Sequence, residues 1–231
     1  MKTLEELLAG TETACPPVDT RAAAPPSRVT MQGAYTNLVP LDPSRHAADL
    51  YEPTHGEGSQ NLWRYLWDGP FSSETAFRSA LERKAASDDP LFFAITEPQS
   101  GRALGYASYM RIEPANRCIE VGGILFSPAL QRTRAATEAM YLMARHAFED
   151  LEYRRYEWKC DALNRPSMRA ALRLGFAYEG FFRQHMIVKG RNRDTAWFSM
   201  LDSEWPARKA AFESWLSPEN FDADGRQRTA L

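Results

Sequence analysis

Apolar residues recur at intervals of three and four along six stretches of the chain, which is the spacing of one face of an α-helix. The stretch around Trp63 and Trp67 is strongly apolar and stops at Gly69-Pro70, a pair that breaks helices. Another stretch follows Asn164, a favoured helix cap, and has Pro166 in its first turn. The predicted helices cover residues 43–54, 59–68, 72–89, 131–149, 165–174 and 203–216.

Between these helices the pattern changes to short runs rich in β-branched and aromatic residues, which are typical of strands. Strands are predicted over residues 36–42, 90–98, 101–114, 117–128, 153–163, 176–190 and 193–202. The turns "QSG" and "PAN" join the second, third and fourth of these strands. Because such short links join neighbouring strands that run in opposite directions, these three strands are expected to form an antiparallel meander.

The chain is expected to hold one domain with an extension at each end. Residues 1–30 include "CPPVDTRAAAPPS", which is rich in proline and small residues and has no sustained period, so an extended, flexible segment is predicted there. The folded domain is predicted over residues 31–217, and a polar tail over residues 218–231.

Composition narrows the classes of function. The formal net charge of -2 argues against a broad nucleic-acid surface. No apolar run is long enough to span a membrane, and "MKTLEELLAG" has glutamates where an export signal needs an apolar core, so neither a membrane partner nor export is expected. The 3 cysteines lie far apart without disulfide or metal spacing, which favours reduced thiols and a cytoplasmic location.

The stretch "SPALQRTRAATEAM", residues 127–140, places Arg132 and Arg134 where the long helix is predicted to begin. The N-terminus of a helix has free N–H groups and partial positive charge, so cations are disfavoured there. Two interpretations remain open. Either both arginines point into solvent at a small energetic cost, or the N–H groups and the guanidiniums together bind an anion.

Two sequence motifs support the interpretation that this site binds an anion. "QRTRAA" matches the coenzyme A phosphate loop Q/R-x-x-G-x-G/A, and "NRPS" followed by "LGFAYEG" matches a second motif further along. From about Thr36 to Asp202 the chain resembles the GNAT superfamily of N-acetyltransferases, in particular the branch that includes the ribosomal-protein N-terminal acetyltransferases. The resemblance implies an α+β fold, in which helices flank a central, mostly antiparallel, twisted sheet that is splayed at its middle. Arg134 departs from the motif, which has glycine at this position.

The resemblance also implies acetyl-CoA as the co-substrate. Its pantetheine arm is expected to pair with Ile124, Leu125 and Phe126, with Asn164 near the same arm. Its pyrophosphate is expected against Gln131, Arg132, Thr133, Arg134, Ala135, Ala136 and Thr137. Gly122-Gly123 interrupts the same strand, which indicates a bulge or a close approach to the backbone. The 4 histidines form no metal-binding motif, so no metal is expected.

Glu120 and Ser167 are the candidates for the chemistry. Glu120 matches the position of a catalytic glutamate in related enzymes, where the carboxylate accepts the proton that the attacking amine loses. The alternative is an ion pair on the sheet with Arg117 or Arg155. By the resemblance, Ser167 protonates the leaving thiolate. The alternative is that Ser167 only belongs to the first turn of a helix that Asn164 caps.

The acceptor is expected between the first helices and the closing hairpin, against Trp63, Trp67, Phe71, Phe182 and His185, although most aromatic residues of a domain serve its core.

The predicted function is acetyl transfer to a primary amine by direct attack, since neither Cys118 nor Cys160 has a nearby base that would activate a thiol. A small-molecule amine is favoured as the acceptor, and a peptide N-terminus is the competitor. A non-catalytic acyl-CoA sensor is the alternative from another class, and a homodimer is left open.

Overall fold

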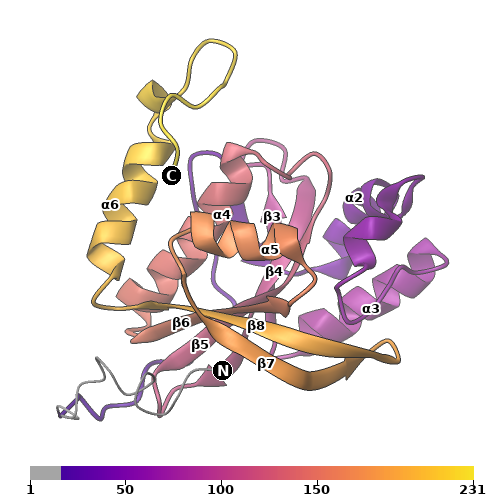
Figure 1. The fold of residues 1–231 in the computed structure, drawn as a ribbon. Coiled ribbons are helices and arrows are strands. Elements are labelled where there is room, and N and C mark those ends of the chain that lie inside the picture. Colours follow the sequence, from indigo (N-terminus) through magenta and orange to yellow (C-terminus); the bar gives the residue numbers. More distant parts are fainter. Residues whose placement is uncertain (1–16) are drawn as a thin grey trace.

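The computed structural model describes residues 17–231, which fold around one eight-stranded sheet (Figure 1). The strands are β1 (Met31–Gln32), β2 (Asn37–Pro40), β3 (Leu91–Thr96), β4 (Ala103–Glu113), β5 (Cys118–Phe126), β6 (Arg155–Asp161), β7 (Ala177–Val188) and β8 (Arg191–Leu201). The helices are α2 (Pro43–His55), α3 (Glu74–Ala86), α4 (Arg134–Arg145), α5 (Arg165–Arg173) and α6 (Trp205–Leu216), with short helical turns η1 (Ser59–Trp63), η2 (His146–Asp150) and η3 (Pro218–Asn220). Residues 1–16, and with them half of the predicted extended segment 1–30, lie outside the described residues.

The strands lie in the order β1-β2-β3-β4-β5-β6-β8-β7. All neighbouring strands are antiparallel except β5 and β6, which are parallel because the chain returns through α4 between them. The predicted α+β fold and the antiparallel β3–β4–β5 meander are therefore confirmed.

The first half of the sheet is buried on both faces. Phe93 and Ile95 of β3 pack into the core cluster that contains α4 and α6, whereas the alternate residues Phe92 and Ala94 pack with α2 and α3. Figure 1 shows α4 and α6 over one part of the sheet and the α2–α3 pair at its other end. The long apolar run of β3 follows from this double cover, since both sets of side chains face helices.

Residues 59–68 do not form the predicted helix, and only η1 is helical. The Trp63 carbonyl accepts from the Leu66 N–H at 3.3 Å, the spacing of a 3₁₀ turn, and also from Lys189 Nζ at 2.8 Å, which bonds to the Gly69 carbonyl as well. The Trp63 indole Nε1 donates to the Thr54 carbonyl at 2.7 Å. Tertiary contacts therefore override the helical pattern of this stretch.

Helix α4 begins at Arg134 and not at Gln131 as predicted. Arg132 has a left-handed φ of 61°, which a right-handed helix cannot contain, and Thr133 then caps the helix by accepting from the Ala136 N–H at 3.1 Å. Arg132 thus precedes the helix, and only Arg134 lies in its first turn.

The segments outside the predicted core pack onto the domain. The Ala23 N–H donates to the Pro114 carbonyl at 3.0 Å, and the Ala23 side chain is buried. At the other end, the Trp215 indole donates to Gln227 at 2.9 Å, and the Phe221 ring stands edge-on to Trp215. The C-terminal residues therefore return to α6.

Candidate active site

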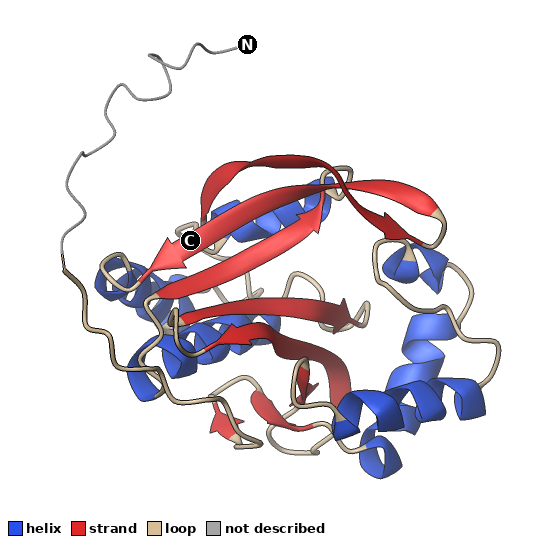
Figure 2. Ribbon diagram, turned by 90° about the horizontal axis from the view of Figure 1, so that it is seen from below, coloured by secondary structure: helices blue, strands red, loops and turns tan. Residues whose placement is uncertain are grey.

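Strands β5 and β6 part in the middle of the sheet. Their pairing runs from Cys118–Arg155 to Val121–Trp158 and then stops, whereas β5 continues to Phe126 beside β4 alone. Figure 2 shows the strands on the two sides of this point diverging. We call Gly122–Phe126 the parted segment of β5. Gly123, at a φ of 58°, bulges the strand at its start, with the position of an added Cβ 3.1 Å from Phe92 and Ser108 atoms.

The parted segment has backbone groups that no neighbouring strand uses. The Ser127 N–H donates to the Leu104 carbonyl at 2.9 Å, so by antiparallel alternation the groups of Leu125 face β4, and those of Ile124 and Phe126 face away from it. Gln131 Nε2 donates to the Phe126 carbonyl at 3.2 Å. The N–H and carbonyl of Ile124 and the N–H of Phe126 are therefore left for a ligand, while Leu125 is buried in the core.

The N-terminus of α4 offers a second set of donors. Among residues 17–231, no acceptor is bonded to the N–H groups of Arg132, Arg134 and Ala135. The N–H groups of Ala136 and Thr137 are already taken, by the Thr133 hydroxyl and carbonyl. Of the residues 131–137 that were predicted to bind an anion, Ala136 and Thr137 therefore have no free N–H group to offer it.

Arg134 takes the glycine position of the phosphate-loop motif without distorting the loop, because its backbone is helical. Its guanidinium carbon lies 4.1 Å from the centre of the Phe221 ring and 5.0 Å from that of Tyr35. The side chain is thus directed onto the C-terminal segment, away from its own N–H group.

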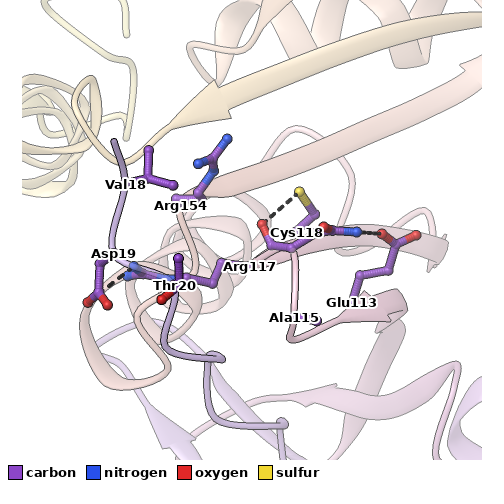
Figure 3. Close-up of a pocket in the computed structure, with 9 residues that line it drawn as sticks. Val18, Asp19, Thr20, Glu113, Ala115, Arg117, Cys118 and Arg154 are labelled. Carbon is purple, nitrogen blue, oxygen red and sulfur yellow. Dashed lines mark hydrogen bonds and ion pairs between the residues drawn. The ribbon is translucent and has the colours of Figure 1, made fainter. Parts of the chain in front are cut away.

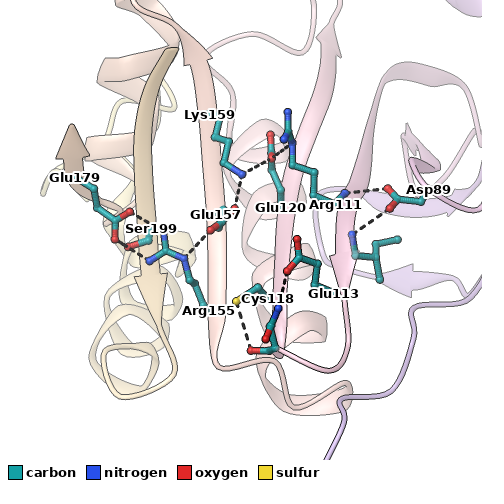
Figure 4. A network of polar contacts seen from close by, with 12 residues as sticks. Asp89, Arg111, Glu113, Cys118, Glu120, Arg155, Glu157, Lys159, Glu179 and Ser199 are labelled. Carbon is teal, nitrogen blue, oxygen red and sulfur yellow. Dashed lines mark hydrogen bonds and ion pairs between the residues drawn. The ribbon is translucent and has the colours of Figure 1, made fainter. Parts of the chain in front are cut away.

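Glu120 lies at the centre of a charged network (Figure 4). The residue is 4% exposed, and its Oε2 accepts a hydrogen bond from Lys159 Nζ at 3.0 Å. Arg111 Nε lies 3.0 Å from the same oxygen but does not point at it. Burial raises the pKa of Glu120 above its ordinary value, and the two cations oppose that rise.

The network continues along β6. Lys159 Nζ also donates to Glu157 at 2.5 Å, and Arg155 joins Glu157 at 2.6 Å to Glu179 at 2.6 Å. Arg117 instead donates to the Glu152 carbonyl. The alternative that paired Glu120 with Arg117 or Arg155 is therefore wrong about the partner. β5–β6 pairing, which sequence reasoning could not see, brings Lys159 to Glu120.

Ser167 lies on the opposite face of the sheet from Glu120. Its Oγ accepts from the Trp158 indole at 3.0 Å, and Trp158 belongs to the last residue pair before β5 and β6 part. Asn164 caps α5, with its Oδ1 accepting from the Ser167 N–H at 3.2 Å. Since successive residues of a strand alternate in side, the Trp158 side chain faces α5 and that of Lys159 faces Glu120. The candidate acid and base therefore flank the parting point from two sides.

The predicted acceptor residues separate into two groups. Trp63 is fully buried and Phe71 packs edge-on against it, so both belong to the core between α2 and α3 and do not form an open pocket wall. Trp67 is 53% exposed. Phe182 and His185 line a cavity of about 750 Å³ on the β7–β8 hairpin, together with Arg183, Gln184, Asn192 and Asp194.

A separate cavity of about 370 Å³ lies at the β4–β5 turn and contains none of the predicted site residues (Figure 3). Arg117, Cys118 and Asp19 are among its lining residues, and burial raises the pKa of the Cys118 thiol.

Residues 17–231 contain no group of three or more His, Cys, Asp or Glu side chains that could hold a metal ion. In the same part of the chain, every helix is too short or too polar to cross a bilayer.

Comparison with known proteins agrees with this geometry. Residues 36–177 match the family model described as an acetyltransferase (GNAT) domain. The crystal structure of a GCN5-related N-acetyltransferase from Brucella melitensis superposes with a TM-score of 0.89 at 47% sequence identity, covering 91% of this chain and 95% of that chain.

Two curated relatives are more distant. The uncharacterized N-acetyltransferase YnaD of Bacillus subtilis (strain 168) is 26% identical over 157 residues, which are 68% of this chain and 88% of the relative. The ribosomal-protein-serine acetyltransferase of Escherichia coli (strain K12) is 35% identical over 102 residues, 44% of this chain and 56% of that protein. The resemblance stated from the two motifs, including its branch, is confirmed.

Proposed function

The chain belongs to the GNAT family of N-acetyltransferases, and from this premise we propose that it moves an acetyl group from acetyl-CoA to the primary amine of a small molecule. The observation that carries the proposal is the parting of β5 from β6 between a buried carboxylate and a serine hydroxyl. The parted segment and the N-terminus of α4 supply hydrogen-bond donors and acceptors for the coenzyme.

The residues present fit the coenzyme. The backbone groups of Ile124 and Phe126 suit the amides of the pantetheine arm, and the N–H groups of Arg132, Arg134 and Ala135 suit a pyrophosphate. Acetyl-CoA supplies the acyl group as a thioester, which an uncharged amine attacks directly. The N–H group of Phe126 or Ile124 is the donor available to a negative charge that develops on an acyl oxygen.

Glu120 is proposed as the group that removes the proton from the acceptor, directly or through a water molecule. An ammonium has no free electron pair, so this proton must leave before attack. Burial raises the pKa of Glu120, which makes its carboxylate a stronger base than an exposed one. Lys159 holds the carboxylate in one orientation through its hydrogen bond.

Ser167 is proposed as a weak acid toward the departing thiolate. Its oxygen accepts the hydrogen bond of the Trp158 indole, so its own O–H can donate to a ligand, in competition with the Cys160 thiol nearby. A thiolate leaves readily at neutral pH, so only a modest contribution is expected from this residue.

A small acceptor is favoured over a peptide by the contacts of the closing hairpin. Lys189, at the tip of the hairpin, bonds to the carbonyls of Trp63 and Gly69. The Tyr65 hydroxyl donates to the Leu163 carbonyl at 3.1 Å. These bonds tie the hairpin and the start of α5 to the segment between η1 and α3, which restricts the room for an extended chain.

The proposal is tested by measuring release of coenzyme A thiol from acetyl-CoA with a panel of small amines and of N-terminal peptides, alongside calorimetric binding of acetyl-CoA. Release with small amines is expected, and it should be lost in Glu120→Gln but kept in Glu113→Gln, an exposed glutamate of β4. Release with peptides alone would show that the acceptor is a peptide N-terminus and not a small amine. Tight binding without release across the whole panel would establish the non-catalytic sensor instead.

A further inference from the structure

Arg193 on β8 is a buried cation that has no partner in the described part of the chain. The residue is 7% exposed, and its guanidinium joins none of the hydrogen bonds or ion pairs formed among residues 17–231. Its Nε is closed off from solvent. Removing a guanidinium from water is costly unless an anion or acceptors replace the water. Arg155, on the neighbouring strand β6, is by contrast bonded to two carboxylates.

The position of Arg193 follows from strand register. The last pair between β6 and β8 is Asp161–Thr195, and Arg193 lies two residues further along β8, on the same side as Thr195. It therefore extends past the end of β6. The Thr195 hydroxyl lies 2.9 Å from His185 Nδ1, which places the predicted acceptor residue His185 on that side too.

Three of the carboxylates on this face already have cations as partners. Glu120, Glu157 and Glu179 are matched by three cations in one continuous network, namely Arg111, Lys159 and Arg155. Asp161 is the acid whose charge acts most strongly on Arg193, but the two form no ion pair. The Asp161 carboxylate accepts instead from the Leu163 N–H at 2.8 Å.

The guanidinium of Arg193 lies within charge–charge range of the proposed base. The charges of both Glu120 and Arg111 act on Arg193, and the charges of Arg111, Arg193 and Lys159 together help burial to lower the pKa of His185. A ligand that reached Glu120 from this side would therefore meet a guanidinium that none of the described carboxylates contacts directly. Its planar set of donors matches a carboxylate or a phosphate.

Resting on the proposed function, we propose that the acceptor is a small primary amine that also carries an anionic group, a carboxylate or a phosphate, and that Arg193 binds this group. Arg193 then sets specificity, and it also fixes the distance between the anion and the amine that Glu120 deprotonates. A neutral amine of the same size would leave the guanidinium buried and unpaired, so it would be bound more weakly.

The experiment compares matched acceptors in the thiol-release assay. Each anionic amine is paired with its neutral counterpart: β-alanine with β-alaninamide, and phosphoethanolamine with ethanolamine. The wild-type protein is expected to favour the anionic member by about tenfold or more in kcat/KM, and which pair shows the larger ratio separates carboxylate from phosphate. The same assay also compares two peptides that carry Asp or Asn at their second residue. A higher kcat/KM for the Asp peptide than for β-alanine and phosphoethanolamine would overturn the small-molecule assignment.

Variants locate the effect. Arg193→Gln should remove the preference by raising KM for the anionic acceptor, Arg193→Lys should keep part of it, and Arg191→Gln, an exposed residue of the same strand, should leave it unchanged. Equal losses for both members of a pair in Arg193→Gln, or a wild-type preference for the neutral amine, would overturn the proposal.

A binding measurement separates this proposal from the proposed function. Calorimetry with the protein and coenzyme A tests propionate and ethyl phosphate, which carry the anion without the amine. If no acceptor gives turnover, the proposed function fails, and these titrations still decide the role of Arg193. The site is supported if the wild-type protein binds either anion and if Arg193→Lys weakens this binding less than Arg193→Gln does. The proposal is overturned if neither anion binds.

Discussion

Replacing Lys159 with methionine should both destabilise the protein and shift its pH dependence. The side chain is 4% exposed and bonds to two carboxylates, Glu120 at 3.0 Å and Glu157 at 2.5 Å. Its Nζ also lies 3.9 Å from the centre of the Trp197 ring. Methionine has a similar length and can keep the contact with this ring, so the main loss is the charge and its hydrogen bonds.

The magnitude follows from what remains. Removing one partner of a buried ion pair costs about 3–5 kcal/mol, because the other charge stays buried and uncompensated. Here Arg111 Nε still lies 3.0 Å from Glu120, and Arg155 still bonds to Glu157. Both carboxylates thus keep one cation, and a loss of about 2–4 kcal/mol in the free energy of unfolding is expected.

The pH dependence has a definite sign. Burial already raises the pKa of Glu120, so the folded protein keeps this proton to a higher pH than the unfolded chain does. Stability from this group is therefore greatest below its ordinary pKa and is lost as pH rises through the folded value. Lysine opposes the rise, so Lys159→Met should raise the pKa further. The variant should lose more stability at pH 8 than at pH 5, and its activity should need a higher pH.

Urea unfolding, followed by tryptophan fluorescence at both pH values, measures the free energy of unfolding. The acid limb of the pH profile of kcat/KM reports the pKa of the base. Lys209→Met is the control, since Lys209 pairs with Glu149 at 2.8 Å in a half-exposed position and should cost less than about 1 kcal/mol. A loss in Lys159→Met no larger than in this control, or an acid limb that stays in place or moves to lower pH, would refute the reasoning.

Three further predictions concern the proposed chemistry and the coenzyme. Glu120→Gln should lower kcat by about 10²–10⁴-fold with acetyl-CoA binding within about twofold of wild type, measured by thiol release and calorimetry; a change confined to KM would contradict a base. Ser167→Ala should lower kcat only about three- to tenfold, and complete loss would make the hydroxyl essential rather than auxiliary. Arg134→Pro removes one N–H group at a helical position that accepts proline, because Thr133 before it is extended (ψ 166°). It should weaken acetyl-CoA binding about tenfold or more relative to Arg134→Met, which keeps that N–H, and equal affinities would exclude this amide from the site.

Local patterns in the sequence were sufficient for most elements. The β-branched and aromatic runs of β3–β5, the cap at Asn164 and the periodicity of α4 depend on residues a few positions apart, and these elements occur in the structure. The two motifs likewise identified the family, because a phosphate loop and a helix cap are local devices. Where a short-range pattern met long-range contacts, it failed: the helix does not continue after Trp63, and Lys189, more than a hundred residues away, bonds to the carbonyls of Trp63 and Gly69.

For the candidate site, the sequence predicted which residues belong to it and on which elements they lie, but not which side chains contact one another. Sequence placed Glu120 on a strand and Ser167 on a helix, but the pairing of β5 with β6 set Lys159 beside Glu120, and the packing of α5 on β6 set the Trp158 indole against Ser167. Trp63 was predicted to line the acceptor pocket because it is aromatic, but its side chain is fully buried in the core. Arg193 could not be distinguished from its neighbours Arg191 and Arg183, since whether a charge is buried and whether it is paired depend on which strands meet. Periodicity is a property of one segment, whereas desolvation and charge balance are properties of several segments brought together.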